Sequence, residues 1–288
     1  MTFYRRIFPA ILLCCSVNAA PALAGLFDST PKPSSAVSDE TISQIQSAFD
    51  DERYLDASKI VDQSLFSHAD DPRLTYWAAE LSLVHGAYQD ALTNFTAAKK
   101  DPKMHDLALA GEGIALSELG RHDEAMASLQ AAVKDEPSAW RAWNALGSEY
   151  DRRHDWANAE AAYANALSSS GGAAIVLNNR GFSRLSQKRP DIAIPDLVAA
   201  LQKKPDLAVA RSNLRLAMSM QGEYDRAIKG APAADQAEVL NNAGFAAMLR
   251  GDYAKATELL TEAMKAKNGY YAIAAANLEL TQNLAKGQ

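Results

Sequence analysis

The chain has 288 residues, of which 22% are charged, and a formal net charge of −6. This acidic balance argues against nucleic acid or anionic lipid as the binding partner. Its two cysteines, Cys14 and Cys15, are adjacent and close to the N-terminus, so they do not provide the Cys framework of a small disulfide-stabilised fold.

Residues 1–24 have the pattern of a secretory signal peptide. Arg5 and Arg6 form a positive start, and the apolar run 7–17 is too short to span a bilayer as a helix. Ala22-Leu23-Ala24 is a small-x-small cleavage site. The sequence predicts cleavage after Ala24. An uncleaved membrane anchor, lipidation at Cys14 or Cys15, and a twin-arginine signal remain as alternatives.

Cleavage would leave a mature chain with no cysteine and a net charge of −8. Such a chain has no disulfide, no thiol catalysis and no Cys-ligated metal. Residues 25–38 are rich in Ser and Pro and are predicted to be a flexible linker. Ser38 is expected to cap a helix whose first turn carries Asp39 and Glu40, close to the positive end of the helix dipole.

From this point the chain repeats itself. Small residues recur at five successive steps of 34, at Ala57, Ala91, Ala125, Ala159, Ala193 and Ala227, and Ala256 follows after 29. A second small residue stands twelve positions before most of these anchors, as Gly147 does before Ala159. We expect each such pair to mark a close crossing of two helices. Turn glycines separate the paired helices, at Gly86, Gly120, Gly222 and Gly251.

The pattern predicts an all-α fold, an α-solenoid of about seven helix–turn–helix hairpins with a C-terminal capping helix. The hairpins are expected at roughly 39–68, 72–101, 103–135, 138–169, 173–203, 206–230 and 235–267. The domain prediction is therefore a solenoid over 39–267 and a capping helix and tail over 268–288. The period and the small-residue positions resemble the tetratricopeptide repeat (TPR) family, which implies a protein-binding scaffold.

Three departures from the repeat carry expectations of their own. Arg215 and Ile45 occupy the position of the crossing glycine, which predicts looser crossings or, for Ile45, an atypical cap. Pro195 lies early in a second helix, where it should kink the helix without breaking it. The second helix of the sixth hairpin should stop near Lys229.

We find no catalytic constellation in the sequence, and we predict neither a cofactor nor a metal site. The five histidines are spread over several repeats with no local ligand pair such as His-x3-His. An enzyme whose active site the repeats support would need a segment outside them, and 25–38 and 268–288 are too short for a catalytic domain. The sequence therefore predicts a protein that is not an enzyme.

The first helices of the hairpins are expected to carry the binding face. Recurrent amides lie fourteen or fifteen positions before the anchors, at Asn144, Asn178, Asn179, Asn213, Asn241 and Asn242. An apolar strip accompanies them at Phe182, Leu185, Leu216, Phe245 and Met248. The amides could pair with the backbone of an extended peptide, in which case alanine replacements would weaken binding but leave melting nearly unchanged. The alternative is that these residues pack between hairpins.

Two stretches, ARSNLRLAMSMQGEYDRA (210–227) and LNNAGFAAMLRGDYAKATELLTEAM (240–264), resemble the TadD group of the Flp (tight-adherence) pilus assembly system. This resemblance implies a periplasmic scaffold, often associated with the outer membrane in that group, whose partners are pilus or secretin assembly components. The alternative is a TPR scaffold for polysaccharide export or outer-membrane assembly. The predicted mature chain does not insert into the membrane, and self-association through an end of the stack remains open.

Overall fold

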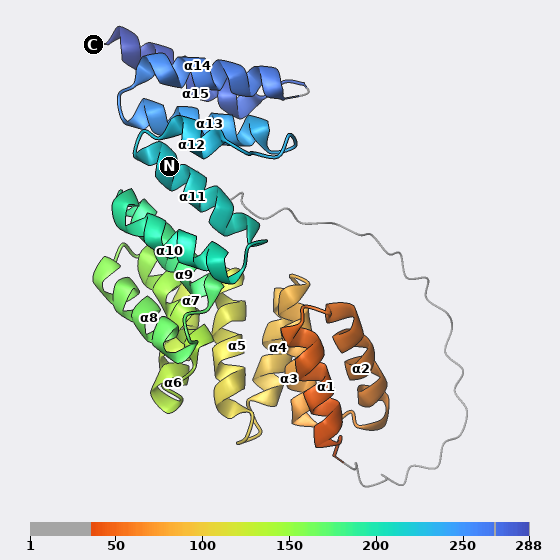
Figure 1. Cartoon of the computed structure of the whole chain (residues 1–288). Helices are drawn as coiled ribbons and strands as arrows, with labels where there is room; N and C mark the ends of the chain where they lie inside the picture. Colours follow the sequence, from red (N-terminus) through yellow and green to blue (C-terminus); the bar gives the residue numbers. More distant parts are fainter. Residues whose placement is uncertain (1–35, 268, 288) are drawn as a thin grey trace. The chain divides into compact units, whose positions relative to one another are not determined.

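The computed structural model describes residues 36–267 and 269–287, which form fifteen helices and no strand (Figure 1). The helices are α1 (Asp39–Asp50), α2 (Tyr54–Ser67), α3 (Pro72–Val84), α4 (Tyr88–Ala98), α5 (His105–Glu118), α6 (His122–Asp135), α7 (Trp140–Arg152), α8 (Trp156–Ser169), α9 (Ala174–Ser186), α10 (Pro190–Lys203), α11 (Ala208–Met220), α12 (Tyr224–Ile228), α13 (Gln236–Leu249), α14 (Tyr253–Ala266) and α15 (Ala272–Lys286). The predicted signal peptide, 1–24, and residues 25–35 of the predicted linker lie outside the described residues.

The helices pair in chain order as seven hairpins, each of which packs on the next, and α15 packs on α13 and α14 as a cap. Buried side chains form a series of clusters along the array rather than one central core. This arrangement confirms the predicted all-α solenoid with a capping helix. Within the part of the chain that the structure describes, no helix is both long and apolar enough to cross a membrane.

The anchor alanines are buried, and the atoms nearest to each crossing glycine belong mainly to a larger residue of the second helix. A Cβ built on Gly147 would lie 2.6 Å from the ring of Tyr163, the residue sixteen positions later. The same offset relates Gly113 to Leu129, Gly181 to Leu197 and Gly244 to Leu260, each at less than 3.0 Å. The missing Cβ therefore makes room chiefly for a large side chain of the second helix, and at Gly181 the carbonyl oxygen of the anchor Ala193 is also close, at 3.4 Å from the added Cβ.

The sixth hairpin is truncated, as predicted, because α12 ends at Ile228. Its glycine position is held by Arg215, and the residue sixteen positions later, Ala231, lies beyond the helix. The Arg215 guanidinium donates through Nη1 to the carbonyl oxygens of Ala227, at 2.5 Å, and Lys229, at 3.3 Å. The guanidinium therefore caps the end of the shortened helix.

The structure at helix starts and in turns agrees with what the sequence predicts. The Ser38 Oγ accepts a hydrogen bond from the Thr41 N–H at 3.1 Å, which confirms the predicted cap of α1. Helix α10 continues through Pro195 without a break. The backbone φ is positive at the four predicted turn glycines and also at Glu52, His154 and Lys188, which occupy the same place in repeats that lack the glycine. The turn geometry is therefore set by the repeat and not by glycine alone.

Candidate binding surface on the first helices

A cavity of about 270 Å³ is formed by the first helices of three consecutive hairpins, α5, α7 and α9. It is lined by Ile114, Ser117, Glu118, Trp140, Arg141, Asn144, Ala145, Ser148, Ile175 and Asn179. We refer to it as the α5–α7–α9 cavity. Its lining combines apolar groups, hydroxyls and amides, which are suited to a mostly neutral ligand that also forms hydrogen bonds.

The repeat explains why these residues come together. Ile114 and Ser148 are 34 positions apart, and so are Arg141 and Ile175. Because each hairpin repeats the last, residues one period apart occupy equivalent places on neighbouring helices. The cavity is therefore a surface on which a position of the repeat occurs on two neighbouring helices with different side chains.

One cation lines the cavity, and its charge is already balanced. Arg141 donates from Nη1 and Nη2 to the two carboxylate oxygens of Glu80, at 2.7 and 2.8 Å, and the Tyr76 hydroxyl donates to the same carboxylate at 2.8 Å. Glu80 is 1% exposed and Arg141 is 38% exposed at the side chain. The bidentate pair joins α3 to α7, two hairpins apart, and leaves no unpaired positive charge at this site.

The Glu80 pair also affects the ionisation of its neighbours. Burial opposes the charge on Arg141, but the attraction of Glu80 and its hydrogen bonds outweigh it, so the pKa of Arg141 is raised. The pKa of Tyr76 is raised first by burial and then by the Glu80 charge. Both groups therefore keep their ordinary charge states at neutral pH, and the pair acts as a fixed structural contact beneath the cavity.

The predicted amides form hydrogen-bonded chains between hairpins. Asn213 Nδ2 donates to Asn178 Oδ1 at 2.9 Å, and Asn178 Nδ2 donates to Asn179 Oδ1 at 3.1 Å. Asn179 Nδ2 then donates to Asn144 Oδ1 at 3.1 Å. Asn178 and Asn213 are buried, whereas Asn144 and Asn179 line the cavity. The chain of amides thus runs from the packed interior to the candidate binding surface.

A second chain of amides lies nearer the C-terminus. Asn277 on the capping helix donates to Asn241 Oδ1 at 3.0 Å, and Asn241 donates to Asn242 Oδ1 at 3.3 Å. Asn241 is buried and Asn242 is half-buried. Asn178, Asn213 and Asn241 therefore agree with the alternative that the sequence left open, in which the amides join neighbouring hairpins.

Some residues of the predicted apolar strip are buried, and others are partly exposed. Leu185 and Met248 lie in buried clusters, so these two residues are not available to a partner. Phe182 and Leu216 are half-buried, and Phe245 is 38% exposed. The exposed part of the strip is therefore shorter than the sequence suggested.

Sequence reasoning missed Trp140, Arg141 and Ile175 as lining residues. Arg141 precedes Asn144 by three positions and Ser148 by seven, so all three share one helical face. Extending the expected face by one turn toward the N-terminus of each first helix would have found them. Side chains of metal-binding type also come together at His105, Asp106 and Asp135, none of which lines this cavity.

These features define an α-solenoid of stacked helical hairpins. A tetratricopeptide repeat family model matches residues 42–105, 111–174 and 144–208, which together include more than half of the chain. The chain belongs to the tetratricopeptide repeat family. Proteins of this family are generally non-catalytic scaffolds, and the repeats indicate protein–protein interaction.

Solved structures support the same fold. The Cut9–Hcn1 hetero-tetramer of the APC/C matches with a TM-score of 0.64 at 16% identity, over 84% of this chain and 49% of that chain. TTC0263, a thermophilic TPR protein in Thermus thermophilus, matches with a TM-score of 0.55 at 20% identity, over 62% and 97% of the two chains. A repeat protein from Parabacteroides merdae matches with a TM-score of 0.51 at 16% identity, over 85% and 98%. No curated protein matches this chain.

Proposed function

We propose that this chain is an exported, non-enzymatic TPR scaffold that binds envelope proteins and assists assembly of a Flp (tight-adherence) pilus and its secretin. The binding surface is the α5–α7–α9 cavity. The observation that carries the binding proposal is the lining of this cavity, in which amides and hydroxyls from three successive first helices lie among apolar side chains.

The charged side chains of the cavity indicate which kind of peptide segment it binds. Arg141 is paired with Glu80, so a partner carboxylate would have to compete with a bidentate ion pair. Glu118, also in the lining, adds negative charge. We therefore assign to the cavity an extended internal segment, with apolar side chains toward Trp140 and Ile175 and backbone groups toward the amides, rather than an acidic chain terminus.

The pilus assignment rests on the likeness of residues 210–227 and 240–264 to the TadD group. The shortened helix α12, which begins within the first of these stretches, and the closing helix α15 are consistent with it. The periplasmic location rests on the signal pattern of residues 1–24. N-terminal sequencing of the chain recovered from an osmotic-shock fraction would test export: a start at Gly25 supports it, and retention of Met1 in the cytoplasm contradicts it.

Site-specific photo-crosslinking in the native cell tests the partner and the surface together. A photoreactive residue replaces Ile175, which lines the cavity and is 39% exposed, and a matched one replaces Asn165 on the second helix α8. Crosslinked proteins are purified through a tag and identified by mass spectrometry.

We expect Ile175 to capture a pilus secretin or its neighbouring assembly proteins, and Asn165 to capture far less of them. Recovery of polysaccharide-export or general outer-membrane assembly proteins from Ile175 would retain the surface but refute the pilus role. Equal capture of the same proteins from Asn165 would refute the cavity as the binding surface.

A further inference from the structure

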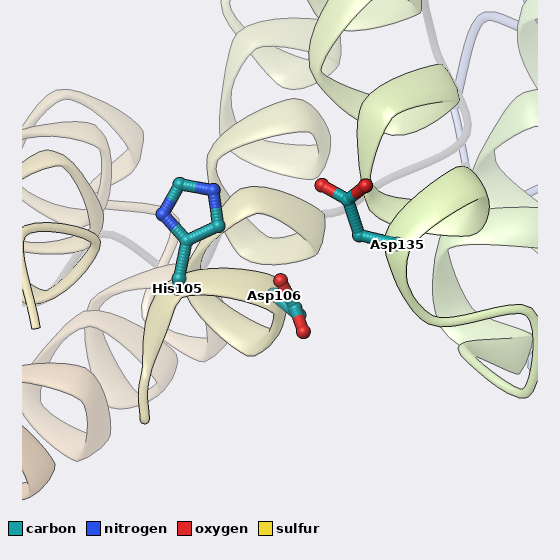
Figure 2. Close-up of side chains that lie close together, drawn as sticks. All are labelled: His105, Asp106 and Asp135. Carbon is teal, nitrogen blue, oxygen red and sulfur yellow. The ribbon is translucent and has the colours of Figure 1, made fainter. Parts of the chain in front are cut away.

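Three metal-binding side chains meet at one end of the third hairpin, outside the α5–α7–α9 cavity (Figure 2). His105 and Asp106 are the first two residues of α5, and Asp135 is the last residue of α6. Since the two helices run antiparallel within one hairpin, the start of α5 lies beside the end of α6. One ligand atom from each side chain lies within 4.8 Å of those of the other two.

The orientation of the imidazole is set by a residue outside the cluster. The Nδ1 of His105 lies 3.1 Å from the carbonyl oxygen of Lys99, and the other ring nitrogen is on the side of Asp135 (Figure 2). When Nδ1 donates its proton to that carbonyl, Nε2 keeps a lone pair. Metal-binding histidines are commonly held in this way, by a backbone carbonyl that fixes the tautomer and the ring orientation.

The two carboxylates are paired with no cationic side chain of the described residues, although Asp106 lies in the first turn of α5, near the positive end of that helix dipole. Neither Asp106 nor Asp135 forms an ion pair or a side-chain hydrogen bond within residues 36–267 and 269–287. Asp135 also ends α6, where the free carbonyl groups make the helix terminus negative. Lys134 lies in the same last turn but pairs with neither carboxylate. A bound cation would offset this accumulation of negative charge.

We propose that His105, Asp106 and Asp135 bind one Zn²⁺ ion. An imidazole together with two carboxylates suits zinc, whereas Ca²⁺ and Mg²⁺ prefer oxygen ligands alone. Zinc–ligand distances of about 2.0–2.2 Å place tetrahedral ligands about 3.4 Å apart. Ligand atoms that now lie up to 4.8 Å apart must therefore move closer, and the exposed side chain of Asp135 can rotate to do so. Water completes the coordination.

Such an ion would connect the first helical residues of the third hairpin with its last one. His105 follows the link from α4, and Asp135 precedes the link to α7. Zinc would thus join two inter-hairpin connections at one point and stabilise the hairpin against opening. This role is independent of the proposed pilus function, since it depends on no partner protein.

The test is a metal titration of the full chain as isolated, after removal of bound metal with EDTA. Zn²⁺ is added at pH 7.5 and followed by isothermal titration calorimetry, and Co²⁺ is used as a spectroscopic probe of the coordination. We expect one equivalent of Zn²⁺ to bind and the melting temperature to rise. His105→Gln and Asp135→Asn should each weaken binding at least about tenfold, since ligand loss should exceed the effect of losing an outer-shell contact.

His85→Gln is the matched control, because His85 is also a histidine at a helix end but lies outside the cluster. It should leave Zn²⁺ binding unchanged. Circular dichroism of each variant establishes that the helices are retained, and Asp135→Asn alters an exposed residue at a helix end. Absence of a one-equivalent site, or affinity unchanged in both cluster variants, would overturn the proposal. Displacement of Zn²⁺ by equimolar Ca²⁺ would overturn the assignment to zinc.

Discussion

Gly147→Ala tests the physical basis of the repeat at its closest crossing. The new Cβ would lie 2.6–2.8 Å from three ring carbons of Tyr163. Tyr163 is 1% exposed, and its hydroxyl donates to Asp151 Oδ2 at 2.8 Å, so the ring cannot move aside without breaking this hydrogen bond. Overpacking of this kind costs about 1–3 kcal/mol. Alanine also restores about 1 kcal/mol of helix propensity. We therefore expect a net loss of about 1 kcal/mol.

The assay is urea unfolding followed by circular dichroism, together with hydrogen exchange of α7 and α8, because repeat arrays can unfold locally. Tyr163→Ala provides the control background: once the ring is absent, Gly147→Ala should stabilise the hairpin by up to about 1 kcal/mol of propensity. A Gly147→Ala variant at least as stable as the parent, with Tyr163 in place, would refute the argument that the missing Cβ makes room for the ring.

Three further changes probe other parts of the array. Burial raises the pKa of Asp151 despite hydrogen bonds from Ser183 and Tyr163. The folded protein therefore holds this proton more tightly than the unfolded chain does. The resulting contribution to the free energy of unfolding is complete below about pH 4 and is lost as the pH rises through the raised pKa. The unfolding free energy of the parent, relative to Asp151→Asn, should fall from about pH 3 to 7 in urea titrations, and a rise would contradict this. Arg215→Ala should remove the cap of α12, at a cost of about 1.5–3 kcal/mol, and increase its hydrogen exchange; unchanged exchange would show that the guanidinium does not hold the helix end. Asn178→Ala should lower the melting temperature, because it leaves the buried donor of its neighbour unpaired, at about 1–3 kcal/mol, while Asn242→Ala, at the end of a chain of amides, should not; equal effects would contradict the separation of buried and surface amides.

Much of the fold can be predicted from the sequence because successive hairpins pack their two helices in the same way. The anchor Ala159 and its equivalents are buried, and helix starts at Tyr88, Trp156 and Tyr253 recur three positions before their anchors. Each signal is short in range, since small residues, turn residues and caps act within one hairpin. Such local information is readable along a single chain without knowledge of the neighbouring hairpin.

The residue that each crossing glycine contacts could not be predicted from the sequence. Gly147 and Ala159 are both small, and spacing alone could not distinguish a glycine that meets an alanine from one that accommodates Tyr163. The distinction depends on the rotation of each helix about its axis, which side-chain packing sets. The same limit hid the His105 and Asp135 pair, which are 30 positions apart and meet through the antiparallel packing of α5 and α6.

The amides show how one residue type can serve both the fold and its surface. Asn178 could be assigned to a binding face because it lies on a first helix, yet it accepts from Asn213 on the next hairpin and is buried. The same chain of hydrogen bonds ends at Asn144, which lines the cavity. An amide can do both because it donates and accepts at once. The buried members therefore fix the orientation of the exposed ones, and a partner that binds at Asn144 meets a donor whose position is already set by the packing between hairpins.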